Sequence, residues 1–271
     1  MMSSAVSIRA ERVPALKVTQ RRVLRSELTK FRSLRSTVYT MATAVVLMIG
    51  LGALFSAVTA SQYKAGPAGI NAVSTSLSGT LFAVVAFGVL GALMMSGEYS
   101  TGMIRSSLTA VPRRLPVLWA KLGVFAGTAF AASLFASFVS FFLGQALLSS
   151  HHLNVAITAP GALRSVVGAA LYVTVAGLIG VALGALFRNT AAAIATFTGV
   201  FFVIPLLAGL LPASISGHVA PYLPSNAGEG LWGGASNLPN ALSPWTGFAL
   251  LCGYAVVLIG AAAWRLRRAD A

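Results

Sequence analysis

Six long apolar stretches constrain this sequence more than any other feature, because each one is long enough to cross a lipid bilayer as a single helix. A membrane-spanning helix needs about 20 mostly apolar residues to cross roughly 30 Å of hydrocarbon. The predicted spans are residues 39–60, 77–96, 122–148, 166–187, 191–213 and 245–264. We therefore predict an all-α integral membrane protein, with six transmembrane helices in one domain over residues 39–264.

The composition supports the same class of protein. Charged residues make up 9% of the 271-residue chain and hydrophobic residues 57%, whereas an ordinary soluble domain carries about 25% charged residues. So few charges cannot cover the surface of a soluble globule of this size, which excludes a free-standing cytosolic domain. Cys252 is the one cysteine, so an internal disulfide framework and a cysteine-rich zinc site are also excluded.

The positions of the basic residues predict how the chain crosses the membrane. The chain has 19 lysines and arginines. All of them except Lys64 and Arg164 lie before the first span, between spans two and three, between spans four and five, or after span six. Loops rich in lysine and arginine stay in the cytoplasm. We therefore predict a multi-pass plasma-membrane protein with both termini cytoplasmic, including a tail at residues 265–271. This charge is spread along one membrane face rather than gathered in a compact patch, so no nucleic-acid partner is predicted.

The segment before the first span divides into two parts. Residues 1–20 are predicted to be disordered. Residues 21–38 are predicted to form an amphipathic helix at the membrane interface, because apolar residues recur at helical spacing and basic residues occupy the other directions. The residues that define this helix are Leu24, Leu28, Phe31, Arg32 and Arg35. Membrane lipid is its expected partner, and a solvated run of charges ahead of the span is the alternative interpretation.

One predicted external loop, residues 214–243, differs from the others. It is rich in Gly, Pro and Asn, yet it carries Tyr222 and Trp232, and such aromatic residues favour the boundary between membrane and water. Two interpretations remain open at this point. The loop could form short half-helices that dip back into the outer leaflet, or an irregular interfacial segment.

Several kinds of chemistry are missing from the sequence. None of its lysines follows a glycine and precedes Ser or Thr, so there is no phosphate-binding P-loop. The predicted spans contain no Asp, Glu, Lys, Arg or His, although ion-coupled carriers usually place ionisable residues there. A membrane serine protease is disfavoured because no span offers a histidine. We predict no catalytic, cofactor-binding or metal-binding residues in this chain.

Small and polar residues within the spans indicate helix contacts. Serines recur on one face of span three, and two pairs of glycines have the small-xxx-small spacing that allows helices to approach closely. These residues are Ser133, Ser137, Ser140 and the neighbouring Gln145, with the pairs Gly123–Gly127 and Gly180–Gly184. We favour helix packing over the lining of a substrate pathway as their role.

The predicted cytoplasmic loop at residues 97–115 has the most specific pattern. Glu98 stands at the inner mouth of span two, and a short helix is predicted over residues 101–110. Pro112 ends this helix, because the residue before a proline is pushed out of the helical region. From the residues alone, a docking element and an ordinary basic turn are equally supported.

This loop resembles that of the type-2 ATP-binding cassette (ABC) exporter permeases. In that family an acidic residue ends span two, a Gly-Thr-type helix and a Pro-Arg turn follow, and a lysine opens span three. The matching residues are Glu98, Gly102, Arg105, Pro112, Arg113, Arg114 and Lys121. Met103 departs from the pattern, since many members have threonine after the glycine, whereas here Thr101 precedes it. The basic helix before span one is also similar to the family's interfacial helix.

The resemblance implies the permease subunit of an ATP-dependent exporter. Two six-span chains, identical or different, would form the pathway, and two copies of a cytoplasmic ABC ATPase would supply ATP hydrolysis. This chain would bind no cofactor, because ATP and magnesium belong to the ATPase. The residues that the resemblance assigns to ATPase contact are Glu98, Tyr99, Thr101, Gly102, Arg105, Pro112, Arg113 and Arg114.

Two other functions remain open. The chain could be a membrane anchor or assembly subunit that binds a cytoplasmic partner and transports nothing, or it could be an ion-coupled secondary carrier. Spans without charges suit apolar or amphipathic cargo such as drugs and lipids, but they do not identify it.

Overall fold

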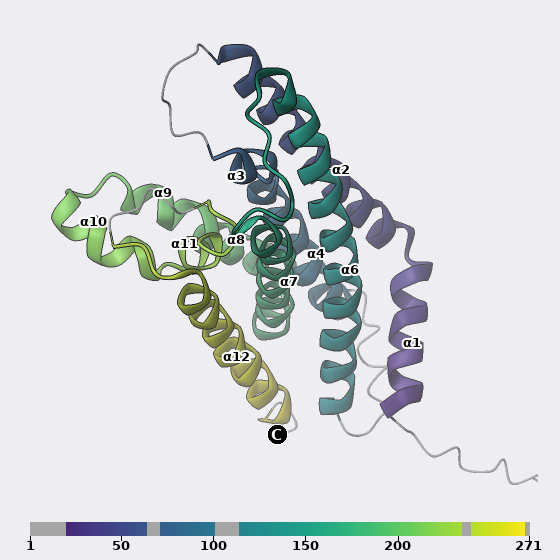
Figure 1. Ribbon diagram of the computed structural model, residues 1–271. Coiled ribbons are helices and arrows are strands. Elements are labelled where there is room, and N and C mark those ends of the chain that lie inside the picture. The colour runs from purple at the N-terminus through teal and green to yellow at the C-terminus, as the bar shows by residue number, and fades with distance from the viewer. Residues whose placement is uncertain (1–19, 64–70, 101–113, 235–239, 269–271) are drawn as a thin grey trace, which may run out of the picture.

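A computed structural model describes residues 20–63, 71–100, 114–234 and 240–268, and within these ranges the regular structure is entirely helical. Figure 1 shows the helices as one bundle with a smaller group of short helices at its side. In chain order they are α1 (Gln20–Ser33), α2 (Arg35–Gln62), α3 (Ala72–Ser76), α4 (Thr80–Ser100), α6 (Arg114–Leu148), η1 (Ser149–His151), α7 (Ala162–Phe187), α8 (Thr190–Thr198), η2 (Gly199–Val203), α9 (Ile204–Ala208), α10 (Ala213–Val219), η3 (Ala220–Tyr222), α11 (Pro224–Glu229) and α12 (Pro244–Arg268).

The predicted class of six-span helical membrane protein is confirmed. In the described ranges, six helical segments are long and apolar enough to cross a membrane: α2, α4, α6, α7, the run from α8 to α9, and α12. The first described residues of α1 and the last residues of α12 lie at the same end of the bundle (Figure 1). An even number of spans places them there.

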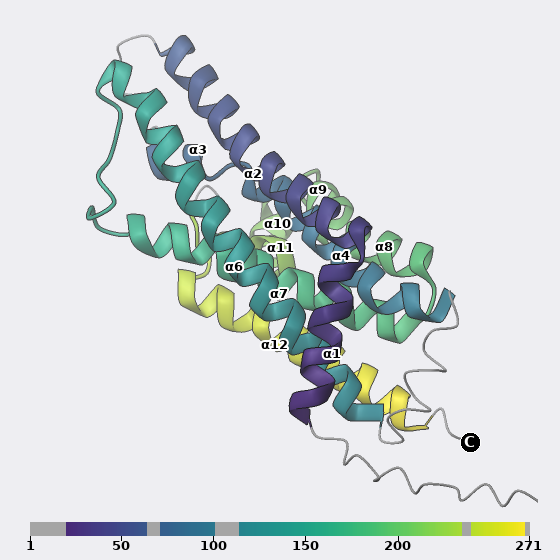
Figure 2. The ribbon, with the colours of Figure 1, turned by 90° about the vertical axis from the view of Figure 1, so that its right-hand side faces the viewer.

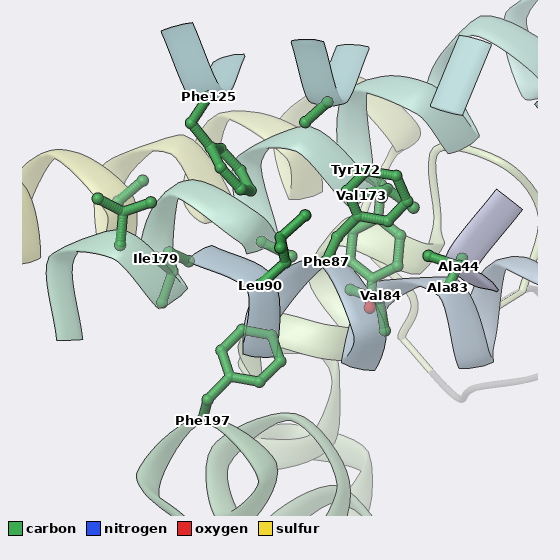
Figure 3. Close-up of a cluster of buried hydrophobic side chains, with 14 of the residues drawn as sticks. Ala44, Ala83, Val84, Phe87, Leu90, Phe125, Tyr172, Val173, Ile179 and Phe197 are labelled. Carbon is green, nitrogen blue, oxygen red and sulfur yellow. The ribbon is translucent and has the colours of Figure 1, made fainter. Parts of the chain in front are cut away.

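Helix α7 forms the centre of the bundle. It is buried along almost its whole length and packs against α4, α6 and α12. Phe87 of α4, Phe125 of α6 and Tyr172 of α7 meet in the apolar core (Figure 3). Glycines allow α4 and α7 to approach this closely, because a Cβ atom at Gly180 would collide with the backbone carbonyl of Gly88.

The two predicted glycine pairs have different outcomes. Gly180 and Gly184 both face the backbone of α4, so this pair marks a close helix contact. A Cβ atom at Gly127 would meet nothing within 4 Å, and one at Gly123 would meet only the tip of the Leu24 side chain. That second pair therefore does not bring two helix backbones together in this chain.

The polar residues of span three hold helices together, in agreement with the packing interpretation. The hydroxyl of Ser140 donates to the carbonyl of Ser76 at 2.7 Å. The side-chain amide of Gln145 donates to the hydroxyl of Ser76 at 2.9 Å and to the carbonyl of Ala72 at 3.1 Å. These bonds join α6 to both ends of α3, where buried polar groups need partners within the protein.

Span five is shorter and less regular than the predicted helix over residues 191–213. It ends at Ala208, and its middle turn, η2, is a π-helix between α8 and α9. Pro205 follows that turn and supplies the physical reason. A proline has no N–H to donate and its ring collides with the carbonyl four residues earlier, so the backbone widens in the turn before it.

The segment at residues 214–243 contains short helices, α10, η3 and α11, where it is described. Helix α11 packs on α12, and a Cβ atom at Gly247 of α12 would collide with the Ala227 carbonyl. The hydroxyl of Tyr254 on α12 also donates to the carbonyl of Tyr222 at 2.9 Å. These contacts fix the short helices against the bundle, so the described part of this segment is not an irregular loop.

Large apolar side chains also cover the outside of the bundle. Leu206 on α9 is 71% exposed, and Val256 and Val257 on α12 are 68% and 69% exposed. In a membrane such faces contact lipid or another chain rather than water. The exposed apolar surface therefore agrees with a chain that lies within the bilayer.

Candidate coupling site

Helix α1 packs on the bundle through one narrow face. Val23, Glu27 and Phe31 recur every fourth residue on this face and are buried, and the helix contacts α6. Leu24 and Leu28 are 36% and 39% exposed, so they remain available to lipid. Of the predicted apolar stripe, only the side chain of Phe31 turns inward to the bundle.

The basic residues predicted for this helix lie on its outer side or beyond its end. Arg32 is exposed. Arg35 does not belong to α1 but begins α2, because Leu34 has extended backbone angles (φ −78°, ψ 102°) that interrupt the helix. The predicted helix over residues 21–38 therefore ends at Ser33, where the chain turns into the first span.

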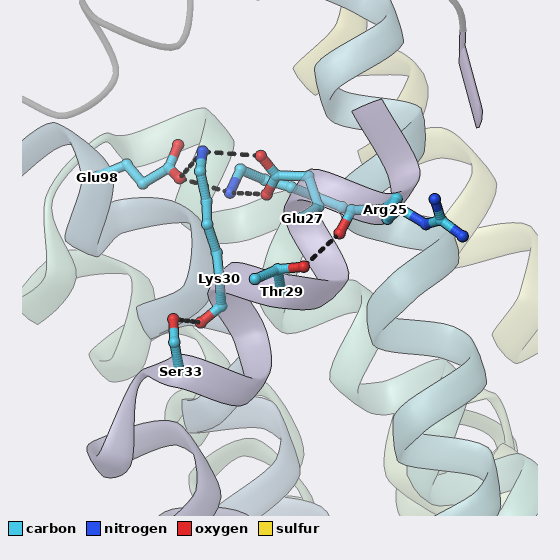
Figure 4. A network of polar contacts seen from close by, with 7 residues as sticks. Arg25, Glu27, Thr29, Lys30, Ser33 and Glu98 are labelled. Atoms are coloured by element: carbon cyan, nitrogen blue, oxygen red, sulfur yellow. Dashed lines mark hydrogen bonds and ion pairs between the residues drawn. The ribbon is translucent and has the colours of Figure 1, made fainter. Parts of the chain in front are cut away.

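Four charged side chains from three helices meet beneath α1. The ammonium group of Lys121, on α6, donates to Glu27 Oε2 of α1 at 2.8 Å and to Glu98 Oε1 of α4 at 2.8 Å. Lys30 Nζ lies 2.9 Å from Glu27 Oε1 and 3.5 Å from Glu98 Oε1. Figure 4 shows the carboxylates of Glu27 and Glu98 turned toward each other with Lys30 beside them, while Arg25 points away. We call Glu27, Lys30, Glu98 and Lys121 the ion-pair cluster.

Three members of the ion-pair cluster are shielded from water, and the fourth, Lys30, is partly exposed. Lys121 is 2% exposed, Glu27 3% and Glu98 8%. A buried charge is tolerated only when it is paired and hydrogen-bonded, so each of these side chains requires the others. Two cations and two anions make the cluster neutral overall, and α1, α4 and α6 are held in one relative position by it.

The ion pairs change the pKa values of the two groups on α1. Burial alone would raise the pKa of the Glu27 carboxyl, but the ammonium groups of Lys121 and Lys30 outweigh it, so that pKa lies below its ordinary value of 4.5. Burial alone would lower the pKa of Lys30, but the hydrogen bond and charge of Glu27 and the charge of Glu98 outweigh it, so the pKa lies above 10.5. Both groups are charged at neutral pH.

A Glu27→Gln variant is expected to unfold a few degrees below the native chain at neutral pH, with a difference that closes in acid. The lowered pKa of Glu27 means that its ion pairs stabilise the fold fully above pH 4.5. This stabilisation is lost as the pH falls through the folded-state value. The measurement is the unfolding temperature of both proteins in detergent from about pH 7 to about pH 3. Arg32→Gln, on the exposed side of α1, is the control, and a Glu27→Gln difference independent of pH would contradict the assignment.

A cavity of about 310 Å³ adjoins the ion-pair cluster. The cavity is lined by the four residues of the ion-pair cluster and by apolar side chains of α1 and α4, including Phe31, Leu90 and Met94. Glu98 Oε2 is buried there without a hydrogen-bond partner among the described residues. The ion-pair cluster therefore borders open space on one side.

The predicted ATPase-contact residues fall into three groups. Glu98 is part of the ion-pair cluster. The guanidinium carbon of Arg188 lies over the ring of Tyr99, 5.3 Å from the ring centre. Arg114 begins α6. The remaining predicted residues lie outside the described part of the chain; they are Thr101, Gly102, Arg105, Pro112 and Arg113. The cluster thus joins the two helices, α4 and α6, that flank residues 101–113.

Sequence reasoning missed Glu27 and did not foresee its contact with Lys121. Glu27 stands among basic residues and was not part of the predicted apolar stripe. A signal was present, because Val23, Glu27 and Phe31 share the helical spacing of a single face. An acidic residue on an otherwise apolar face of a basic helix predicts a buried cation, and Lys121 is the cation that meets it.

Two comparisons with known proteins bear on this arrangement. No curated protein matches the chain in sequence. The family model described as "ABC-2 family transporter protein" matches residues 23–206, a range that includes every residue of the ion-pair cluster. That range covers more than half of the chain. A six-span helical bundle, a cluster that joins the helices on either side of residues 101–113, and this match lead to one conclusion: the chain belongs to the ABC-2 family of transporter proteins.

Proposed function

We propose that the chain is the permease subunit of an ATP-driven exporter in the plasma membrane, with both termini in the cytoplasm. Membership of the ABC-2 family implies an ABC ATPase partner. In this proposal two ATPase subunits dock on the loop between α4 and α6, and a second six-span chain completes the pathway. The ATPase binds ATP and magnesium, and this chain carries no catalytic residue.

The ion-pair cluster is the observation on which the proposal rests. Lys121 bonds to carboxylates on two other helices, at 2.8 Å each. A force applied to residues 101–113 would reach α4 and α6 directly, and it would reach α1 through Glu27. Packed and paired elements move between discrete arrangements rather than deforming continuously. Closure of an ATPase below the loop would then shift three helices together.

The distribution of basic residues supports the proposed orientation. Arg265, near the end of α12, donates to the carbonyl of Leu186 at the end of α7, and Arg188 follows in the next turn. The last residues of α12 lie at the same end of the bundle as the first described residues of α1 (Figure 2), and the bond from Arg265 brings the end of α7 to them. Lysine and arginine concentrate on the cytoplasmic side of membrane proteins, so this end is the one proposed to meet the ATPase.

Vesicles reconstituted with the chain and an ATPase recovered with it from the native membrane test the proposal. We expect ATP hydrolysis by the pair, none by the purified chain alone, and ATP-dependent movement of a fluorescent amphiphile such as rhodamine 6G or a labelled phospholipid. Hydrolysis without movement of any probe would favour the anchor subunit. Movement that stops when an ion gradient is collapsed at constant ATP would favour the secondary carrier.

Replacing Arg105 by alanine is expected to lower ATPase stimulation and transport by about tenfold or more while leaving membrane insertion unchanged. Loss of one charge-assisted contact of about 1.5–3 kcal/mol at a docking surface is enough for this. The measurement is the stimulated ATPase rate in vesicles that contain equal amounts of inserted chain. Arg267→Ala, on an exposed face of α12, is the matched control. Equal rates for native chain and Arg105→Ala would argue against docking on this loop.

A further inference from the structure

A second cavity, of about 340 Å³, lies between α4, the π-turn η2, α9 and α11, away from the ion-pair cluster. Leu81, Phe201, Phe202 and Leu206 are among its apolar lining residues. Its lining also contains Ser225 and Glu229, both from α11. The family match ends at residue 206, so the polar side of this cavity lies beyond the matched range.

Glu229 is unusual in this chain. No other acidic residue occurs between Glu98 and Asp270, and in the described structure neither an ion pair nor a side-chain hydrogen bond is found for its carboxylate. Glu229 is half-buried, and even partial burial of a carboxylate without a positive partner costs free energy. A cation in the cavity would offset that cost.

Ser225 gives independent support for a ligand. It is 2% exposed, lines the same cavity, and its hydroxyl has no hydrogen-bond partner in the described part of the chain. Buried hydroxyl groups are normally hydrogen-bonded. An unused hydroxyl one helical turn before an unpaired carboxylate forms a polar pair that a primary ammonium group, with three N–H donors, can satisfy.

The other walls fit the apolar part of such a ligand. Phe202 and Leu206 present apolar surface, and Phe201 stacks on Phe197 with ring centres 4.5 Å apart. Aromatic faces also attract organic cations. Beside these walls, α11 is held in place, because a Cβ atom at Gly228 would collide with the ring of Tyr172. The polar pair therefore stands on a fixed helix rather than a loose loop.

We propose that this cavity binds an amphipathic primary amine, with its ammonium group between Glu229 and Ser225 and its apolar body against Phe202 and Leu206. The inference deepens the proposed function, on which it rests, by naming amine-bearing amphiphiles as a class of transported cargo. Binding itself requires only this chain, so it can be measured without the ATPase.

The pH dependence follows from the carboxylate. Burial raises the pKa of Glu229 to about 7. Tyr172 on α7 is the titratable group recorded beside it, and a phenol stays neutral in this range. The lining from α4, η2 and α9 adds no titratable side chain. Amine binding should therefore weaken as the pH falls through about 7, where the carboxylate takes up a proton.

Dansylcadaverine is a suitable probe, because its primary amine stays charged between about pH 5 and pH 8. Its fluorescence would be titrated with the full chain in lipid nanodiscs, without any ATPase. Glu229→Gln is expected to weaken binding by about tenfold at pH 8, since a charge-assisted bond is replaced by a neutral one. The same dye with a neutral butyl group in place of the aminopentyl chain is expected to bind weakly and equally to both proteins. Binding to Glu229→Gln should also be independent of pH.

Two further variants keep the test decisive. Glu229→Asp retains the charge and should bind the amine more tightly than Glu229→Gln does, even if both are less stable than the native chain. Ser225→Ala should weaken binding of the primary amine. It should not weaken binding of the trimethylammonium analogue, which has no N–H to donate. Equal affinity of native chain and Glu229→Gln, or of charged and neutral dye, would overturn the proposal. Binding as predicted, without ATP-driven movement of dansylcadaverine in vesicles that do move another amphiphile, would leave the amine site in place and reject amines as transported cargo; if no amphiphile moves, the exporter function fails instead.

Discussion

A Lys121→Met variant is expected to lose about 3–5 kcal/mol of stability, the usual cost of removing one partner from a buried ion pair. Lys121 is 2% exposed and bonds to Glu27 and to Glu98. Methionine retains most of the apolar stem of lysine, so the loss of stability comes from the missing charge rather than from an empty space. The two carboxylates would then face each other with only Lys30 nearby.

Unfolding of the solubilised chain, followed by circular dichroism at pH 7 and in acid, measures this loss. Part of the stability should return in acid, because a carboxyl that takes up a proton no longer needs a cation. Adding Glu27→Gln and Glu98→Gln to Lys121→Met should also recover stability, since no unpaired charge is left buried. Arg32→Met, on the exposed side of α1, controls for a general loss of positive charge. If Lys121→Met unfolds like the native chain, the ion-pair cluster does not hold the helices together.

A Gly180→Leu variant is expected to separate α4 from α7 and to prevent stable folding. Overpacking a core usually costs about 1–3 kcal/mol. For Gly180→Leu the cost should reach or exceed the upper end of that range, because the new Cβ atom would collide with the backbone carbonyl of Gly88. A backbone group cannot rotate away as a side chain can. The close contact between these two helices depends on the absence of a side chain.

Gly127→Leu is the matched control for this variant. Gly127 belongs to a glycine pair with the same spacing, yet a Cβ atom there would meet nothing within 4 Å. Membrane insertion and the denaturant midpoint in mixed detergent would be compared for both variants. We expect near-native values for Gly127→Leu and a large loss for Gly180→Leu. Similar losses in both would mean that small residues, rather than this particular contact, determine stability.

The six spans could be predicted because hydropathy is a local property of the sequence. A stretch of apolar residues must avoid water whichever neighbour it finally packs against. The number of spans and the helical class therefore followed from the sequence. The end of span five did not, since averaging hydropathy over a window conceals a single proline; Pro205 carries the signal for the π-turn that precedes it.

The ion-pair cluster could be predicted only in part. Glu98 stood out by its place at the inner mouth of span two and Lys121 through a family resemblance, but Glu27 pairs with Lys121 across 94 residues of sequence. Helical spacing indicates which residues share a face, yet the rotation of one helix against another decides which side chains meet. Glu229 could not be predicted for a different reason. An acidic residue outside the spans is an ordinary feature of a loop sequence, and only the packing of the short helix α11 places this one beside a cavity.

The neutrality of the ion-pair cluster has a consequence for ionic strength. Salt screens exposed charges over about 10 Å at 0.1 M, and screens buried pairs much less. The two ion pairs of Lys121, with Glu27 and with Glu98, are buried, so a high salt concentration should leave the contact between α1, α4 and α6 intact. Any salt-sensitive step in the working complex would then reside in contacts made by exposed arginines with another subunit.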